Sequence, residues 1–155
     1  MPTRVDVDLR DVVDLLPKML VVEIRSVEIA ILRLAGAGFR EHFGIEITGL
    51  NFIDMAPAAE RSKRGYRQRA MSRYPCGSRS VITAQGPSGK VSTVEIAAFP
   101  VQPFNVGDPP HLFAVAQMLQ HDYLPSEENG DLTVPGSNEF CFLDIGAGLP
   151  IDYSV

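Results

Sequence analysis

The sequence predicts an α+β fold in which helices cover one face of an antiparallel sheet. Two observations lead to this prediction. Runs rich in Val, Ile and Leu, typical of strands, gather near the start and in the second half of the chain, and the longest helical pattern lies between them. The expected order is helix, two strands, two short helices, one longer helix and three strands. This segregation of helices from strands favours an antiparallel sheet with one face on the helices.

The composition is that of one soluble domain. The chain has 155 residues and 45% hydrophobic content, and none of its apolar runs approaches the roughly 18 residues of a membrane span. The N-terminus lacks the apolar core of a signal peptide, so we expect a cytoplasmic protein without membrane insertion. A net charge of −5 argues against nucleic-acid binding. Cys76 and Cys141 are too few and too far apart for a metal site or a disulfide framework, and we interpret both as reduced thiols.

The first element expected is a helix over residues 5–16, with Asp8 as its N-cap and Pro17 as its stop. Its apolar residues share one face, which a second subunit could cover in a homodimer. Alternatively, the face packs on the protein's own sheet. The residues of this candidate dimer interface are Leu9, Val12, Val13 and Leu16.

A hairpin of two strands, residues 19–24 and 29–34, is expected next. The stretch 36–55 follows, around which we expect the rest of the chain to be organised. In it, Phe39 and Phe43 are one helical turn apart, and Gly44 closes this short helix at a position suited to a left-handed cap. Thr48-Gly49 and then residues 51–55 predict a second short turn-helix piece that ends at Pro57.

Residues 58–74 predict the longest helix. Tyr66, Ala70 and Tyr74 recur at helical spacing, with Met71 beside them, and the basic residues occupy the other faces. Gly65 should weaken this helix by about 1 kcal/mol relative to alanine. The stretch holds six of the chain's 14 basic residues: Arg61, Lys63, Arg64, Arg67, Arg69 and Arg73.

Two interpretations of this basic cluster stay open. Its guanidinium groups could hold a phosphate, a nucleotide or an acidic partner surface, with Arg61, Arg64 and Arg67 as the contact residues. The alternative is a solvated helix face. Neither the loop 86–90 nor Gly36-Ala37-Gly38 matches a phosphate-binding or dinucleotide-binding motif.

The second half of the chain predicts three strands. Residues 79–85 and 91–99 are joined by a glycine-containing hairpin loop, and residues 111–120 form the last strand. From residue 121 onward we expect an irregular extension. Its apolar segment FCFLDIGAGLP, residues 140–150, either lies along the sheet or docks on a partner.

The chain resembles the PAS domain, and more narrowly a small bacterial PAS family that opens with Pro-x-Arg-x-Asp-x-Asp and runs into Leu-Pro. The opening corresponds to Pro2, Arg4, Asp6 and Asp8, followed by Leu16-Pro17. Further motif positions are Gly36, Phe39, Phe43-Gly44, Thr48-Gly49 and Ile53-Asp54. The resemblance covers roughly residues 2–120, although the aromatic-rich segment that often precedes the opening is missing.

The resemblance implies a five-stranded antiparallel sheet cupped by helices. It divides the chain into an N-terminal helix or cap (1–18), a PAS core (19–120) and an irregular C-terminal extension (121–155). It also implies a sensor or interaction module rather than a catalyst. If a ligand pocket exists, it should lie between the sheet and the short helices, although plain core packing is the more usual explanation of such residues. The candidate pocket-lining residues are Phe39, Phe43, Ile53, Met55, Tyr66, Met71, Phe99 and Phe113.

Cofactors of other PAS domains are not expected. Phe52 stands where a flavin photoreceptor would carry its reactive cysteine, and the helix 58–74 has no axial histidine for haem. We interpret His42, His111 and His121 as surface or turn residues. If the chain were instead a small α+β enzyme, His42 with Asp54 would be the pair to converge in a pocket.

We therefore expect a stand-alone, non-enzymatic regulatory protein that forms homodimers. It would act on signalling proteins such as kinases or response regulators. A sensor that binds an anionic metabolite or nucleotide through the basic helix is the alternative. A small enzyme is a weaker one.

Overall fold

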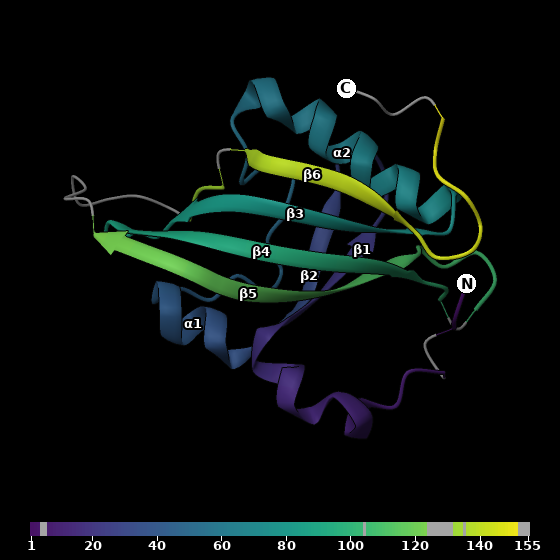
Figure 1. Cartoon of the computed structure of the whole chain (residues 1–155), viewed down its shortest axis with the longest axis horizontal. Helices are drawn as coiled ribbons and strands as arrows, with labels where there is room; N and C mark the ends of the chain where they lie inside the picture. The colour runs from purple at the N-terminus through teal and green to yellow at the C-terminus, as the bar shows by residue number, and fades with distance from the viewer. Residues whose placement is uncertain (4–5, 104, 124–131, 135, 152–155) are drawn as a thin grey trace.

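A computed structural model describes residues 1–3, 6–103, 105–123, 132–134 and 136–151, and, within these, no side chain for Leu9 and Tyr123. Arg4, part of the sequence opening, lies outside the described residues, as do 124–131 and 152–155 of the C-terminal extension. The described chain forms one six-stranded sheet in the order β2-β1-β5-β4-β3-β6 (Figure 1). The strands are β1 (Met19–Ile24), β2 (Ala30–Ala35), β3 (Cys76–Gln85), β4 (Lys90–Val101), β5 (His111–Tyr123) and β6 (Ser137–Asp144).

The α+β class with an antiparallel sheet is confirmed, since every neighbouring pair of strands is antiparallel. The expectation of five strands is wrong by one. Residues 137–144, which were expected to be irregular, pair with β3 from Cys76↔Asp144 to Ile82↔Ser137 and add the sixth strand. The apolar segment that begins at residue 140 thus lies along the sheet as far as residue 144.

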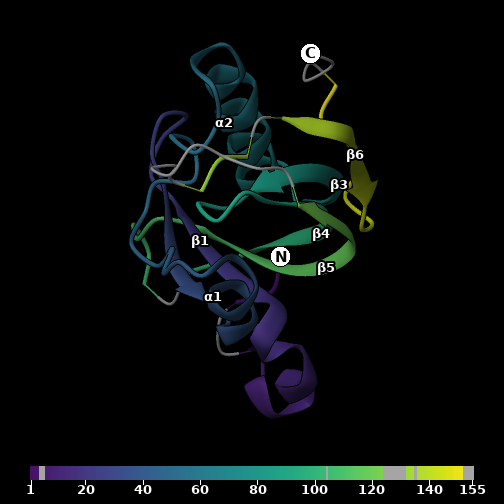
Figure 2. The same ribbon diagram turned by 90° about the vertical axis from the view of Figure 1, so that its left-hand side faces the viewer.

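Helices α1 (Ala37–Phe43) and α2 (Ala58–Arg73) supply side chains to a core on one face of the sheet (Figures 1 and 2). Phe39 and Phe43 of α1 are buried, and Gly44 ends the helix with φ 73°, the left-handed cap that was predicted. Of the turn-helix piece expected at 48–55, the turns are present, but the helical part at 51–55 is wrong. The backbone there makes separate turns, with Asp54 N–H donating to Asn51 and Ala56 N–H to Ile53.

The N-terminal helix η2 (Leu9–Lys18) is a 3-10 helix rather than an α-helix. Asp8 accepts a hydrogen bond from the backbone N–H of Arg10, so the predicted N-cap is confirmed, but Pro17 lies inside the helix and does not stop it. The helix contacts α1 and β5. Val12 and Leu16 are half-buried and Val13 is exposed, so these residues do not share one environment.

Among the described residues, no helix has the length and hydrophobicity needed to span a membrane.

Candidate functional site

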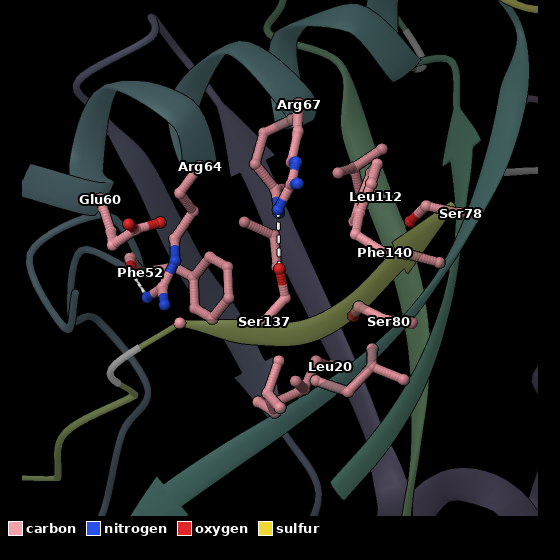
Figure 3. Close-up of a pocket in the computed structure, with 17 residues that line it drawn as sticks. Leu20, Phe52, Glu60, Arg64, Arg67, Ser78, Ser80, Leu112, Ser137 and Phe140 are labelled. Atoms are coloured by element: carbon pink, nitrogen blue, oxygen red, sulfur yellow. Dashed lines mark hydrogen bonds between the residues drawn. The ribbon is translucent and has the colours of Figure 1, made fainter. Parts of the chain in front are cut away.

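A cavity of about 70 Å³ lies between α2 and the inner face of the sheet (Figure 3). Its floor consists of alternate residues of β1, β3, β4 and β5, because alternate side chains of a strand point to the same face. Its apolar lining residues are Leu20, Val22, Phe52, Ile82, Ile96, Ala98, Leu112, Ala114 and Phe140. The polar side chains that line it are Glu60, Arg64, Arg67, Gln68, Ser78, Ser80 and Ser137.

Arg64 extends from α2 into this cavity and is held by backbone carbonyls. Its Nη1 donates to the carbonyl of Phe52 at 3.1 Å and its Nη2 donates to the carbonyl of Val134. The guanidinium carbon lies 4.7 Å from the centre of the Phe52 ring, in cation–π range. Burial lowers the pKa of Arg64 to about 10, because these neutral partners do not replace the lost hydration of the charge.

Arg67 lies one helical turn along the same side of α2. Its Nη1 donates to the hydroxyl of Ser137 at 2.7 Å, and its guanidinium carbon is 4.0 Å from the centre of the Phe140 ring. Burial lowers the pKa of Arg67 as well. Since Ser137 and Phe140 belong to β6, Arg67 connects the cavity wall on α2 to the sixth strand.

Gln68 adds a polar group that the surrounding protein does not satisfy. Its side-chain Oε1 is buried and has no hydrogen-bond partner among the residues that the structure describes. A buried carbonyl oxygen of this kind favours a ligand or water that can donate a hydrogen bond. Ser78 and Ser80 line the facing strand with two further hydroxyl groups.

The close approach of α2 to the β1–β2 turn explains why the arginines of α2 reach the cavity. Gly65 is buried, and a Cβ added to it would lie 1.7 Å from the carbonyl oxygen of Val27 in the β1–β2 turn. Because Arg64 and Gln68 are i and i+4 and Arg67 is i+3, the three side chains lie on one side of the helix.

Among the residues that the structure describes, the cavity lining carries more positive than negative charge. Arg64 and Arg67 contribute two cations, and Glu60 is the one carboxylate among the described lining residues. Glu60 raises the pKa of both arginines by its charge, but that effect is smaller than burial in each case. No described carboxylate comes within 4.0 Å of the Arg64 guanidinium, so an anion there would gain charge-assisted hydrogen bonds.

The structure separates the arginines that sequence reasoning grouped. Arg61 does not line the cavity; it lies 3.4 Å from the carboxylate of Asp54 and donates to the carbonyls of Ala56 and Asp54. Arg64 and Arg67 point toward the sheet. The apolar side of α2 was therefore assigned wrongly in part, since Tyr66 and Tyr74 are 54% and 50% exposed.

Several predicted pocket residues lie elsewhere. Tyr66 is exposed, and Phe99 and Phe113 are neighbours on the opposite face of the sheet, because the adjacent Ala98, Leu112 and Ala114 face the cavity. Those three assignments are wrong. Ile53 and Met71 are buried in the core.

Phe39, Phe43 and Met55 line a second, wholly apolar cavity of about 30 Å³. The two cavities are neighbours, because four residues line both: Leu20, Phe52, Ile82 and Ile96. Its lining lacks any polar side chain to orient a ligand, and core packing is the simpler account of these residues.

The three histidines have different environments. His42 is half-buried, and its Nε2 lies 2.7 Å from the hydroxyl of the fully buried Ser92, so the prediction of a surface residue is wrong for it. Its Nδ1 lies 3.3 Å from the Lys90 ammonium. His111 faces Glu23 at 3.9 Å, and His121 is exposed.

The alternative of a catalytic His42–Asp54 pair gains no support, because the two residues have separate partners. Asp54 accepts a hydrogen bond from Asn51 and pairs with Arg61. Both cysteines are free thiols; Cys76 is buried and Cys141 is exposed.

A family model described as a PAS domain matches residues 1–115, which is most of the chain and includes β1 to α2 and the strands β3 and β4. The chain belongs to the PAS domain family. Membership supports a sensory or regulatory role in general. No curated protein matches the chain.

The family match ends before β6. The wall of the cavity formed by Ser137 and Phe140 therefore comes from outside the matched residues. The sequence left two positions open for this apolar segment, along the sheet or on a partner. The basic residues of α2 gave the one signal that could have located the site, but their two possible faces could not be distinguished.

Proposed function

We propose that this PAS domain is a non-enzymatic sensory and regulatory module whose input is a small anion bound in the cavity under α2. The observation that carries this proposal is the pair Arg64 and Arg67, two cations that extend from one side of α2 into a largely apolar cavity. Largely apolar cavities with a few convergent polar groups are typical of small-molecule sites.

The lining favours a particular kind of ligand. The two guanidinium groups match the planar, bidentate geometry of a carboxylate. The unsatisfied Oε1 of Gln68 favours a hydrogen-bond donor on the same molecule. A cavity of about 70 Å³ limits the ligand to a few non-hydrogen atoms, so a short hydroxy acid fits better than a nucleotide.

The proposed output is a change in the surface offered to partner proteins, such as kinases or response regulators. An anion at Arg64 and Arg67 would favour one packing of α2 on the sheet, because ligand binding selects the conformation to which the ligand binds better. This combines the two functions that the sequence left open, namely an interaction module and an anion sensor.

Calorimetric titration with glycolate and lactate, together with native mass spectrometry of the purified protein, tests the proposal. Arg67→Gln should lower glycolate affinity at least tenfold, because a charge-assisted hydrogen bond contributes about 1.5–3 kcal/mol. Arg73→Gln is the matched control: it removes the same charge from an exposed position of the same helix and should leave the affinity unchanged. Equal affinities for the two variants, with both folded, would refute the site.

A further inference from the structure

The two edges of the sheet are unequal. At one edge, β2 is covered by residues 49–52: Leu32 N–H donates to the carbonyl of Leu50, Gly49 N–H to that of Leu32, and Phe52 N–H to that of Ala30. At the other edge, β6 pairs with β3 on one side, and no backbone hydrogen bond to its second side is present among the described residues.

The β6 edge has few of the features that usually prevent pairing with another chain. Natural edge strands are short, or they carry lysine, proline or a bulge along their length. Here eight residues run from Ser137 to Asp144 without lysine or proline, and four consecutive apolar residues, 140–143, form the middle. The one irregularity in the pairing with β3 lies near the start of the strand, between Val81 and Ile82 on β3.

We propose that β6 pairs antiparallel with β6 of a second copy of this chain, with Cys141 on the two-fold axis, so that one sheet continues across the dimer. In such a pair, residues directly opposite each other must lie on the same face of the continuous sheet. The sum of the two paired residue numbers is then even. The two-fold axis therefore lies between two copies of the same residue, one from each strand. If a second copy of the chain binds this edge, residues 137–144 should be complementary to themselves in one such register.

The register centred on Cys141 is the self-complementary one. It places Phe140 opposite the partner's Phe142 on the cavity face, where Phe140 and Phe142 already stack edge to face at 4.9 Å. Four aromatic rings then meet at the interface, and aromatic cross-strand pairs are favourable. On the outer face, Glu139 meets the partner's Leu143, so no like charges oppose each other.

The neighbouring registers are poorer. Centring the axis on Phe142 places Phe140 opposite the partner's Asp144, and centring it on Phe140 places Asn138 opposite the partner's Phe142. Each of these keeps one aromatic pair, at the axis, instead of two, and leaves the other ring facing a polar side chain. The sequence of β6 therefore favours the register centred on Cys141 for pairing with a second copy. Pairing with a different protein would not require this self-complementarity.

Cysteine cross-linking of the full chain under mild oxidation tests the register. Cys141 is exposed and Cys76 is buried, so the unmodified protein should form a disulfide-linked dimer that Cys141→Ser abolishes. In the Cys141→Ser background, Glu139→Cys and Leu143→Cys should each cross-link poorly alone, because identical residues there are about 13 Å apart along the strands. A mixture of the two should cross-link efficiently.

A charge at the axis tests the dimer without oxidation. Cys141→Glu places two carboxylates opposite each other and should raise the dimer dissociation constant at least tenfold in sedimentation velocity. Cys141→Gln is the matched control without the charge and should remain dimeric, and circular dichroism verifies that both variants are folded. Three results would each overturn the proposal. The dimer could survive Cys141→Glu, the protein could be monomeric in every experiment, or the dimer could be lost only in Val13→Asp.

Discussion

Gly65→Ala separates helix propensity from packing, because the two predict changes of opposite sign in stability. In an exposed helix interior, replacing glycine by alanine raises stability by about 1 kcal/mol. In this fold Gly65 is buried, and the new Cβ would lie 1.7 Å from the carbonyl oxygen of Val27 and 2.7 Å from its carbonyl carbon. Both contacts are to backbone, so no side-chain rotation can relieve them.

The size of the effect follows from the distance. Ordinary contact begins near 3.4 Å, so α2 and the β1–β2 turn would have to separate by about 1.7 Å. Overpacking of this kind costs about 1–3 kcal/mol or more, and a backbone clash is at the upper end of that range. After the propensity gain, we expect a net loss of about 2 kcal/mol in the free energy of unfolding.

Urea denaturation followed by circular dichroism measures this loss, and the melting temperature should fall by about 4–8 °C. Ser62→Ala, at an exposed position of the same helix, is the control and should change stability little or raise it slightly. A Gly65→Ala protein that is more stable than the wild type would refute the close approach of α2. The position of Arg64 and Arg67 over the cavity would then lose its structural basis.

Two further predictions concern pH. Burial, then the charges of Lys90 and His121, lower the pKa of His42 below its ordinary 6.5, so the unfolded chain binds the proton more tightly. Stability should therefore fall as the pH drops below about 6.5, and His42→Gln should reduce that slope in urea titrations. Hydrogen bonds from Arg33, and then Arg25, lower the pKa of Glu23 to about 2. Glu23→Gln should cost about 1–2 kcal/mol at pH 7. Because the folded pKa is depressed, that difference should shrink below pH 4.5 and vanish near pH 2.

Local sequence signals predicted the fold well, because each depends on residues close together in the chain. The hairpin β1–β2, the left-handed cap at Gly44 and the glycine-containing β3–β4 loop follow from apolar runs and turn chemistry alone. The strand β6 was missed because its alternation is weak. Half-buried Phe140 and Phe142 alternate with Cys141 and Leu143, which are apolar too, so the run has no polar face to reveal a strand.

The site was harder to predict because it depends on which side of α2 meets the sheet. Tyr66, Ala70 and Met71 suggested an apolar side, yet Tyr66 faces solvent. The deciding residue is Gly65, whose missing side chain lets the backbone of Val27 approach. A long-range contact of this kind has no signature in the local sequence pattern. Without knowledge of that contact, Arg64 is interpreted as a solvent-exposed cation.

The hydrogen bond from Arg67 to Ser137 connects the cavity to the edge strand β6. We therefore expect that a change at Arg67 in the cavity alters the stability of β6. Ser137 begins β6, and its hydroxyl accepts from Nη1 of Arg67 at 2.7 Å. Ser137→Ala removes this charge-assisted bond at a partly buried position, at a cost of about 1.5 kcal/mol, so amide protection in β6 should fall about tenfold.

Hydrogen exchange measured by mass spectrometry on the peptide covering 137–144 checks this, with the central strand β1 as the internal reference that should not change. Thr83→Ala is the matched control. It also removes a hydroxyl that accepts a hydrogen bond from β6, namely from Asn138, but this hydroxyl lies on the exposed side of the strand and not in the cavity. Glycolate should reproduce the effect of Ser137→Ala in the wild-type protein, since an anion that binds the Arg67 guanidinium competes with Ser137 for the same donor. If Ser137→Ala leaves β6 as protected as before, the cavity and the edge strand are independent, and a ligand under α2 would need another route to the surface.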